Sequence, residues 1–329
     1  MNRMLKKLSI FSLIAILAGI VLVILGVGLG GRMALAIDLG NKSVSTDQDK
    51  NVKMVEYSEK LDAFHSISID TDVYDISLVE GEEYGISYCL PEKEKPKYTV
   101  SKDTLKLKSH AGGSYAQVNL IDLFPSGKRT DTRQNQIKIT VPKHTLLKTV
   151  SAKLDASDLA MEQLQMQTLT LTSDTGDMKL TGISCEEYQI ETDTGDIKME
   201  QITAKTGQLT VDTGDVKMQT GSVDRFKLKT DTGDVKLGGM TLSSFEVQSE
   251  TGDVTVTDSS LEKSNIVSDT GDVKLLLNGD KNEYAYDTGS DTGDVTVNGR
   301  KRDNVLIDAG QKNKIKVRSD SGDITIRVQ

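Results

Sequence analysis

A short motif dominates the second half of this 329-residue chain. Asp-Thr-Gly-Asp, followed by an apolar, a polar and another apolar residue, occurs eight times, with Glu250 and Ser321 as single replacements. The first six copies follow a constant 19-residue period, and the last two come after longer intervals. A degenerate ninth copy, residues 155–159, lies one period upstream. The motif glycines are Gly176, Gly195, Gly214, Gly233, Gly252, Gly271, Gly293 and Gly322.

Each copy has alternating apolar and polar residues on both sides of the glycine. Leu169 to Thr172 precede one copy, and Met178 to Leu180 follow it. Alternation with a period of two around a glycine predicts strand, turn, strand. The glycine is third in the four-residue turn, where a type II turn requires positive φ, and the flanking Asp side chains can bond nearby amides. The eight glycines are therefore predicted to be structural turn residues.

A single repeat unit cannot bury its apolar side alone, so successive units must stack. The sequence predicts an all-β fold, a parallel β-solenoid of 19-residue coils, whose nine coils would extend roughly 40 Å at about 4.8 Å per coil. A stack of antiparallel hairpins is the alternative, which the constant spacing disfavours. Two core ladders follow from the alignment. They are Met178, Ile197, Val216, Val235, Val254, Val273, Val295 and Ile324, and Leu180, Met199, Met218, Leu237, Val256, Leu275, Val297 and Ile326.

The N-terminal segment predicts a membrane anchor. Residues 8–30 carry no charge, and a helix of this length spans a bilayer core of about 30 Å. The boundaries predicted are a cytoplasmic N-terminus over 1–7, a single transmembrane helix over 8–31 and a linker over 32–61. Because Arg3, Lys6 and Lys7 precede the helix, the remainder should lie outside the cell membrane. A signal peptide cleaved after Ala36 is the competing interpretation.

Residues 62–150 contain strand-like runs without the 19-residue period. We expect an N-terminal β cap there, covering the open first coil of the solenoid over 151–329, because an unpaired edge strand promotes aggregation. Asp70 to Val73 echo the repeat motif, and residues 110–133 read as a long inserted loop.

The net charge of −9 arises in the repeat region, since residues 151–329 hold 20 basic and 32 acidic residues. This balance argues against nucleic-acid binding. Stacked coils place the motif carboxylates in two columns, which repel each other. Turn amides and the column Lys179, Lys198, Lys217, Lys236 and Lys274 can offset the repulsion. Alternatively, bound calcium ions could offset the repulsion. The candidate ligands of such a calcium ladder are Asp174, Asp177, Asp193, Asp196, Asp212, Asp215, Asp231 and Asp234.

The remaining candidate residues favour structural roles. Cys185 aligns with Ala204 and other apolar residues of the repeat, so we expect a core position rather than a reactive thiol or a disulfide with Cys89. The three histidines have no metal-ligand spacing. Carbohydrate-active β-helix enzymes place unique clusters where the repeat is interrupted. The interruptions here hold Tyr284 and Tyr286, and the run 300–302, which reads as a solvated loop or a contact for anionic polymer or lipid.

Taken as a set, the anchor, the segment Ile137 to Pro142 and the repeated Asp-Thr-Gly-Asp-Val strands resemble the bacterial putative-adhesin family, a LiaG-like domain of unknown function. The similarity covers about residues 62–329. It implies a β-solenoid at the cell surface, sometimes associated with envelope-stress operons, and it offers no catalytic residues.

From these features we expect a cell-membrane protein without enzymatic activity, acting as an adhesin or surface scaffold and using no cofactor unless calcium binds. Its expected partners are membrane lipid through residues 8–30 and other envelope proteins or cell-wall polymer. One alternative is an envelope-stress accessory that contacts membrane proteins. The other is a carbohydrate-active enzyme.

Overall fold

A computed structural model describes residues 36–38, 43–45, 54–92, 94–109, 115–117, 135–302, 304–307 and 310–329. The chain divides into two units. The unit formed by 1–52 and 112–130 contains an antiparallel sheet of β1 (Ala36–Asp38), β2 (Ser43–Ser45) and β9 (Tyr115–Gln117), in the order β2-β1-β9. The second unit, 53–111 and 131–329, contains the repeats.

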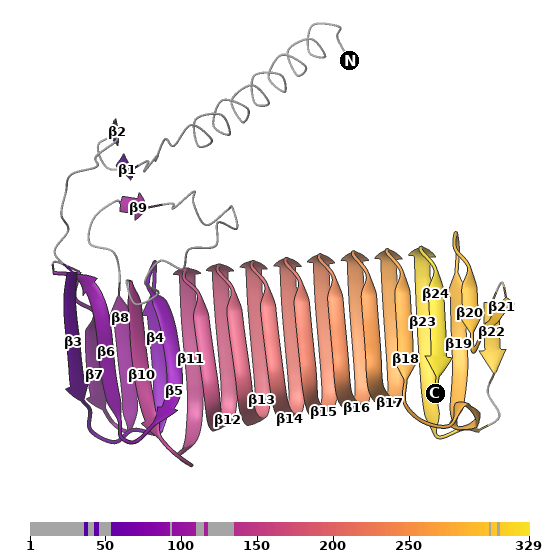
Figure 1. The fold of residues 1–329 in the computed structure, drawn as a ribbon, viewed down its shortest axis with the longest axis horizontal. Coiled ribbons are helices and arrows are strands. Elements are labelled where there is room, and N and C mark those ends of the chain that lie inside the picture. The colour runs from indigo at the N-terminus through magenta and orange to yellow at the C-terminus, as the bar shows by residue number, and fades with distance from the viewer. Residues whose placement is uncertain are drawn as a thin grey trace, which may run out of the picture. The chain divides into compact units, whose positions relative to one another are not determined.

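The repeats form a rod of parallel coils (Figure 1). Neighbouring strands pair in parallel at a constant offset of one repeat, for example Met178 with Ile197 and Ile197 with Val216. This confirms an all-β, solenoid-like fold and excludes the stack of antiparallel hairpins. The strands are β11 (Leu146–Ala156), β12 (Leu159–Thr175), β13 (Met178–Thr194), β14 (Ile197–Thr213), β15 (Val216–Thr232), β16 (Val235–Thr251) and β17 (Val254–Thr270).

Each 17-residue strand bends so that three short runs face inward. In β13 the first run is Met178 and Leu180, the second is Ile183 and Cys185, and the third begins at Tyr188. The first bend lies at Gly182, whose φ of 66° is left-handed. The equivalent residue is left-handed in every full coil, and polar residues or glycine occupy it: Gln163, Gly182, Gln201, Thr220, Gly239 and Asp258. Glycine and Asp tolerate this conformation, whereas the two Gln residues and the β-branched Thr220 adopt it at an energetic cost.

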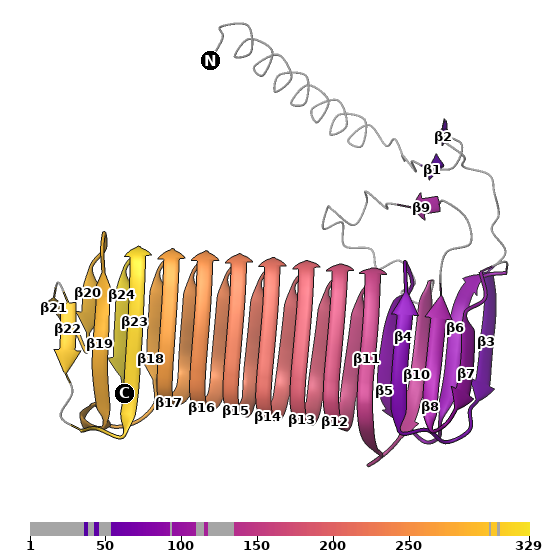
Figure 2. The same ribbon diagram turned by 180° about the vertical axis from the view of Figure 1, so that it is seen from behind.

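The N-terminal end of the rod is built from strands out of chain order (Figure 2). β4 and β5 form a coil that pairs with β11 and β12, and β8 and β10 then cover that coil. β3 and β7 complete this end as antiparallel strands on β6 and β8. The strands are β3 (Met54–Lys60), β4 (Ser66–Thr71), β5 (Asp75–Gly81), β6 (Gly85–Pro91), β7 (Lys97–Ser101), β8 (Thr104–Ser109) and β10 (Gln136–Pro142).

The C-terminal end also departs from chain order. The last strands of the chain, β23 (Asn313–Ser321) and β24 (Ile324–Val328), lie between β17 with β18 (Val273–Leu277) and β19 (Tyr284–Ser290) with β20 (Val295–Val297). The chain therefore skips one coil position, builds the terminal coil, and returns to fill the gap. β21 (Arg300–Arg302) and β22 (Asn304–Ile307) pair antiparallel with the terminal coil, and a 3-10 turn spans Lys281–Glu283.

The predicted core ladders are confirmed in membership and corrected in order. Ile324 pairs with both Val273 and Val295, so the spatial order at this end is 273, 324, 295. The first ladder also extends past Met178 at the other end. In space it runs Ile137, Ile76, Leu159, Met178, Ile197, Val216, Val235, Val254, Val273, Ile324 and Val295. Ten steps at about 4.8 Å give a rod of about 48 Å, longer than the sequence predicted.

In the core, one tyrosine ring occupies the space that a glycine of the neighbouring coil leaves free. Tyr188 is 1% exposed and pairs with Gly207, where an added Cβ would come within 2.1 Å of the Tyr188 ring. Beyond the glycine, Phe226 and Phe245 stack with their centroids 5.6 Å apart. Cys185 is buried between Met166 and Ala204, which confirms the predicted core position, and burial raises the pKa of its thiol to about 12.

Several predictions concern residues outside those described. The cytoplasmic segment 1–7, the transmembrane helix over 8–31 and most of the 110–133 insert lie there, and no helix among the described residues is long and apolar enough to cross a membrane. Within the predicted linker, residues 54–60 form β3 instead. This strand was missed because its side chains are mostly exposed, so the sequence shows no apolar alternation there. The strand is held by backbone hydrogen bonds to β6.

An ion pair at the N-terminal end gives a pH-dependent prediction. Asp103 accepts a hydrogen bond from Lys148 Nζ (2.9 Å) and pairs with His65 Nδ1 (2.7 Å), which lowers the pKa of its carboxyl from 3.8 to about 2. Since the folded pKa is the lower one, this contribution to stability is complete above about pH 4 and is lost as pH falls toward 2. Asp103→Asn should remove part of the fall in melting temperature between those pH values, as followed by circular dichroism. An unchanged acid profile would contradict this. Asn suits the left-handed φ of 63° here.

Candidate functional site

The repeated turn forms one continuous edge of the rod. Each motif glycine from 176 to 252 donates its N–H to the Thr carbonyl of the next coil, as Gly195 does to Thr213 at 3.0 Å. Its φ is strongly positive, 143° at Gly195, and an added Cβ would lie 2.1 Å from the carbonyl oxygen of Gly176. Glycine is therefore required twice, for the backbone angle and for the close approach of successive coils. Seven of the eight motif glycines have a positive φ, and Gly293 does not. The turn is not the predicted type II turn, because φ there is about 80° and the glycine N–H here bonds between coils.

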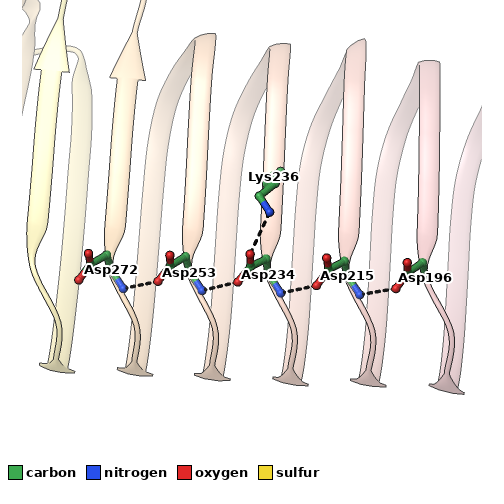
Figure 3. A network of polar contacts seen from close by, with 6 residues as sticks. All are labelled: Asp196, Asp215, Asp234, Lys236, Asp253 and Asp272. Atoms are coloured by element: carbon green, nitrogen blue, oxygen red, sulfur yellow. Dashed lines mark hydrogen bonds and ion pairs between the residues drawn. The ribbon is translucent and has the colours of Figure 1, made fainter. Parts of the chain in front are cut away.

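The second Asp of each motif forms a ladder along this edge (Figure 3). The Oδ1 atom of Asp215 accepts a hydrogen bond from the backbone N–H of Asp234, and the Oδ1 atom of Asp234 accepts one from Asp253. These N···O distances are 2.8 Å and 3.0 Å. In spatial order the ladder comprises Asp75, Asp158, Asp177, Asp196, Asp215, Asp234, Asp253, Asp272, Asp323 and Asp294.

The ladder extends beyond the recognised motifs at its N-terminal end. Asp75 Oδ1 accepts the N–H of Asp158, and burial raises the pKa of the Asp75 carboxyl. Residues 70–73 were aligned with the motif from the sequence, and that alignment is shifted. In the structure, Asp72 and Asp75 occupy the two Asp positions of the motif. The signal that was available is a pair of Asp at the motif spacing, directly before Ile76, as in the other copies.

The predicted lysine column exists but neutralises the ladder at few places. Lys179, Lys198, Lys217 and Lys236 are exposed and pair in register with one another. Lys236 Nζ lies 2.9 Å from Asp234 Oδ2, which lowers the pKa of Asp234. Lys198 instead bonds Glu200 at 3.0 Å. Backbone N–H groups bond the second Asp of each motif from Asp158 to Asp323. They therefore offset the charge of the ladder more regularly than the lysines do.

The first Asp of each motif forms a second column on the same edge. Asp174, Asp193 and Asp212 are exposed, and Lys229 pairs with Asp231 at 2.9 Å. Within the described residues, no three His, Cys, Asp or Glu side chains are grouped so that they could hold a metal ion. The eight candidate ligands thus lie along two columns at the turn edge, and a calcium ladder stays a prediction.

The predicted interruptions of the repeat lie at the C-terminal end. Tyr284 and Tyr286 are 2% and 3% exposed, so they are core residues and cannot act as platforms for sugar rings. Arg300 to Arg302, expected in a loop, form the exposed strand β21. Cys89 and Cys185 are both free thiols, and His65 takes part in the ordinary ion pair described above.

Two substitutions separate the acceptor role of a ladder Asp from its charge. Asp234→Ala removes the acceptor for the Asp253 N–H and the partner of Lys236, so we expect a loss of about 1–2 kcal/mol in unfolding free energy. Asp234→Asn keeps an acceptor oxygen and should lose less than about half of that, because an exposed ion pair contributes little. Urea denaturation of both variants measures the difference. Equal losses would show that the charge, not the hydrogen bond, matters.

Comparison with known proteins identifies the family. The profile of Toastrack DUF4097 matches residues 64–227 and again residues 189–327. The chain belongs to this family. The two matches overlap, which is expected when coils of one length repeat, and together they span nearly all of the rod. The Toastrack assignment agrees with the resemblance to adhesin-like proteins seen in the sequence. No curated protein matches the chain.

Solved structures similar to this Toastrack chain are distant in sequence. A putative adhesin from Bacteroides fragilis is 17% identical with a TM-score of 0.42, covering 83% of this chain and 96% of the other. A putative adhesin from Parabacteroides merdae is 11% identical with a TM-score of 0.45, covering 83% and 97%. A putative lipid binding protein from Parabacteroides distasonis is 13% identical with a TM-score of 0.48, covering 85% and 98%.

Proposed function

We propose that this Toastrack protein is a membrane-anchored rod outside the cell membrane that acts as an adhesin or surface scaffold, without catalysis. The observation that carries the proposal is the aspartate ladder from Asp75 to Asp294, in which each shared Oδ1 accepts a backbone N–H of the neighbouring coil. Such a ladder makes the turn edge a rigid structural element. The uncharged segment 8–30 supports the anchor.

A scaffold role also fits the repeated surface. Successive coils present the same residue types at equivalent outward positions, as at Lys198, Lys217 and Lys236. The ladder carboxylates already have backbone donors, whereas a catalytic acid or base needs a distinct, positioned environment. The repeated edge therefore suits spacing and display better than a reaction centre.

Protease accessibility tests the placement. Protease added to intact protoplasts that express the full chain should digest the rod, and antibody to residues 313–329 should lose its signal. Protection of the rod until the membrane is permeabilised would refute the extracytoplasmic placement.

A comparison of two forms in cells tests the mode of action. Cells producing the full chain and cells secreting a form in which a cleavable signal peptide replaces residues 1–30 are crosslinked, and captured proteins are identified. An adhesin or scaffold should capture the same surface target in both forms. Capture of membrane proteins by the anchored form alone would favour the envelope-stress accessory. Turnover of a wall polysaccharide by the purified chain would refute the absence of catalysis.

A further inference from the structure

Each sheet of the rod finishes in one antiparallel strand at either end (Figure 1). The sheet that contains β5 ends in β3 at the N-terminal end and in β21 at the C-terminal end. The sheet that contains β4 ends in β7 and in β22. Among the described residues, none of these four strands pairs with a second strand, so each has a free edge.

The core is only partly covered at the N-terminal end. Tyr57 of β3 lies opposite the buried Tyr88 and stacks on its ring with the centroids 5.2 Å apart, yet Tyr57 is 39% exposed. On β7, Tyr98 and Val100 lie opposite two buried leucines of β8 and are themselves half-buried. These side chains occupy core-facing positions with no further coil to pack against.

The C-terminal end is open in the same way. Ile307 of β22 lies opposite the buried Tyr286, in a core-facing position, and is 39% exposed. On β21, Arg300 and Arg302 lie opposite two buried valines of β20, so they too occupy core-facing positions, although both are exposed. One sheet therefore ends in an apolar side chain, and the other ends in two guanidinium groups.

The two ends carry opposite charges. Glu56 and Glu59 are exposed on β3, and Glu59 holds a core-facing position opposite a buried isoleucine. Two tyrosine hydroxyls donate hydrogen bonds to Glu59, but among the described residues no lysine or arginine pairs with either carboxylate. Arg300 and Arg302 likewise have no carboxylate partner in the described part of the chain, since the ion pair of β21 is made by Lys301.

These charges favour one way of joining two rods. Charged side chains at core-facing positions of an edge strand prevent it from pairing with a copy of itself. Two N-terminal ends would bring Glu59 against Glu59, and two C-terminal ends would bring the arginines of β21 against each other. Only unlike ends place opposite charges together, and such complementarity selects the partner and the orientation of a contact.

From these features we propose that the C-terminal end of one rod docks on the N-terminal end of a second copy of this chain. A shift along the rod axis places β21 beside β3, running antiparallel, and β22 beside β7, running parallel, because each pair ends the same sheet. Arg300 and Arg302 then face Glu59 and the ring of Tyr57, while Ile307 faces the half-buried side chains of β7.

The proposed contact is heterologous, so it does not close on itself. Each added copy leaves one free end of each kind, and copies therefore join into an open row of rods. This inference goes beyond the proposed function. It involves residues 54–101 and 284–307 only and does not require the anchor, so its failure would leave the proposed placement of the rod unaffected.

Site-specific photocrosslinking of the full chain tests the docking. The photoreactive residue p-benzoylphenylalanine replaces the exposed Ser58 of β3. The chain is purified in detergent micelles and irradiated, and the crosslinked peptides are located by mass spectrometry. We expect adducts that join position 58 of one chain to residues 295–307 of another, with a yield that rises with chain concentration. Since the adduct is read by position, association through residues 8–30 is not counted.

Charge reversal assigns the adduct to the two ends. Glu56→Lys with Glu59→Lys should lower the yield of this adduct about tenfold or more, and Arg300→Glu with Arg302→Glu should do the same. A chain that carries all four substitutions again has opposite charges at its two ends, so it should recover most of the yield. A variant that merely failed to fold would not recover.

The matched control is Lys179→Glu with Lys217→Glu, which reverses two exposed lysines on the side of the rod and should leave the yield unchanged. Four results would overturn the inference. They are adducts between position 58 and residues 54–60 of another chain, which would indicate paired N-terminal ends; adducts to residues 110–134 of the same chain, which would show that the chain covers its own end; no adduct between chains at any concentration; and no recovery in the chain with four substitutions.

Discussion

Gly214→Ala is expected to lower the free energy of unfolding by at least about 3 kcal/mol. The φ of Gly214 is 147°, and the new Cβ would lie 2.1 Å from the carbonyl oxygen of Gly195. That carbonyl belongs to the backbone of the neighbouring coil, so it cannot rotate away as a side chain could. Strain in φ and steric overlap therefore add, at a point held by hydrogen bonds between coils.

Urea denaturation and hydrogen exchange of the full chain measure this effect. Because each coil contacts its neighbours only, exchange should rise first in residues 197–213 and 216–232. The matched control is Gly238→Ala in the next coil, where the nearest atom to an added Cβ is Thr257 Oγ1 at 3.6 Å and φ is not left-handed. The control should change stability by less than about 0.5 kcal/mol. Equal effects of the two substitutions would contradict the proposed coil contact.

Removal of residues 313–329 is expected to free the terminal coil, although that coil precedes them in the chain. β19 and β20 reach the rest of the rod through β23 and β24, which separate them from β17 and β18. The shortened chain should therefore lose amide protection over residues 284–302, and protease should cleave there. Residues 178–251 should stay protected, since none of their strands pairs with β23 or β24.

The same deletion distinguishes the two possible orders of the last coils. In a rod stacked in chain order, residues 313–329 would be the outermost coil, and their loss would leave residues 284–302 in place. Persistent protection of 284–302, measured by hydrogen exchange and mass spectrometry, would contradict the inserted position of β23 and β24.

The repeat made most of the rod predictable. A constant offset of one repeat allows a single register, so the pairing of Met178 with Ile197 and the burial of Cys185 followed from alignment alone. The order of the last coils did not, because the longer final intervals specify loop lengths and not which gap a returning strand fills. The same limit applies at the other end, where β4 and β5 pair with coils that come much later in the chain.

The sequence predicted which residues form the candidate site, but it did not predict most of their hydrogen bonds and ion pairs. The motif identified the turn glycines and the second Asp column, but the acceptor role of Oδ1 depends on how closely the coils stack. Lysines beside the Asp columns suggested ion pairs with these Asp residues. A long lysine side chain on a flat surface can reach several carboxylates, however, and Lys198 pairs with Glu200 instead. Asp75 was missed because the residues between it and Asp72 are Val73 and Tyr74 instead of Thr and Gly.

Pulsed electron paramagnetic resonance tests the stacked order of the coils most directly. Spin labels are placed at position 179 and either 325 or 296, after Cys89→Ser and Cys185→Ala remove the native thiols. Position 325 lies six coils from 179 and position 296 lies seven, so the distances should be about 29 Å and about 34 Å at about 4.8 Å per coil. A shorter distance to 325 than to 296 is the result that the parallel, out-of-order solenoid predicts. A shorter distance to 296, or distances that do not scale with coil number, would contradict it.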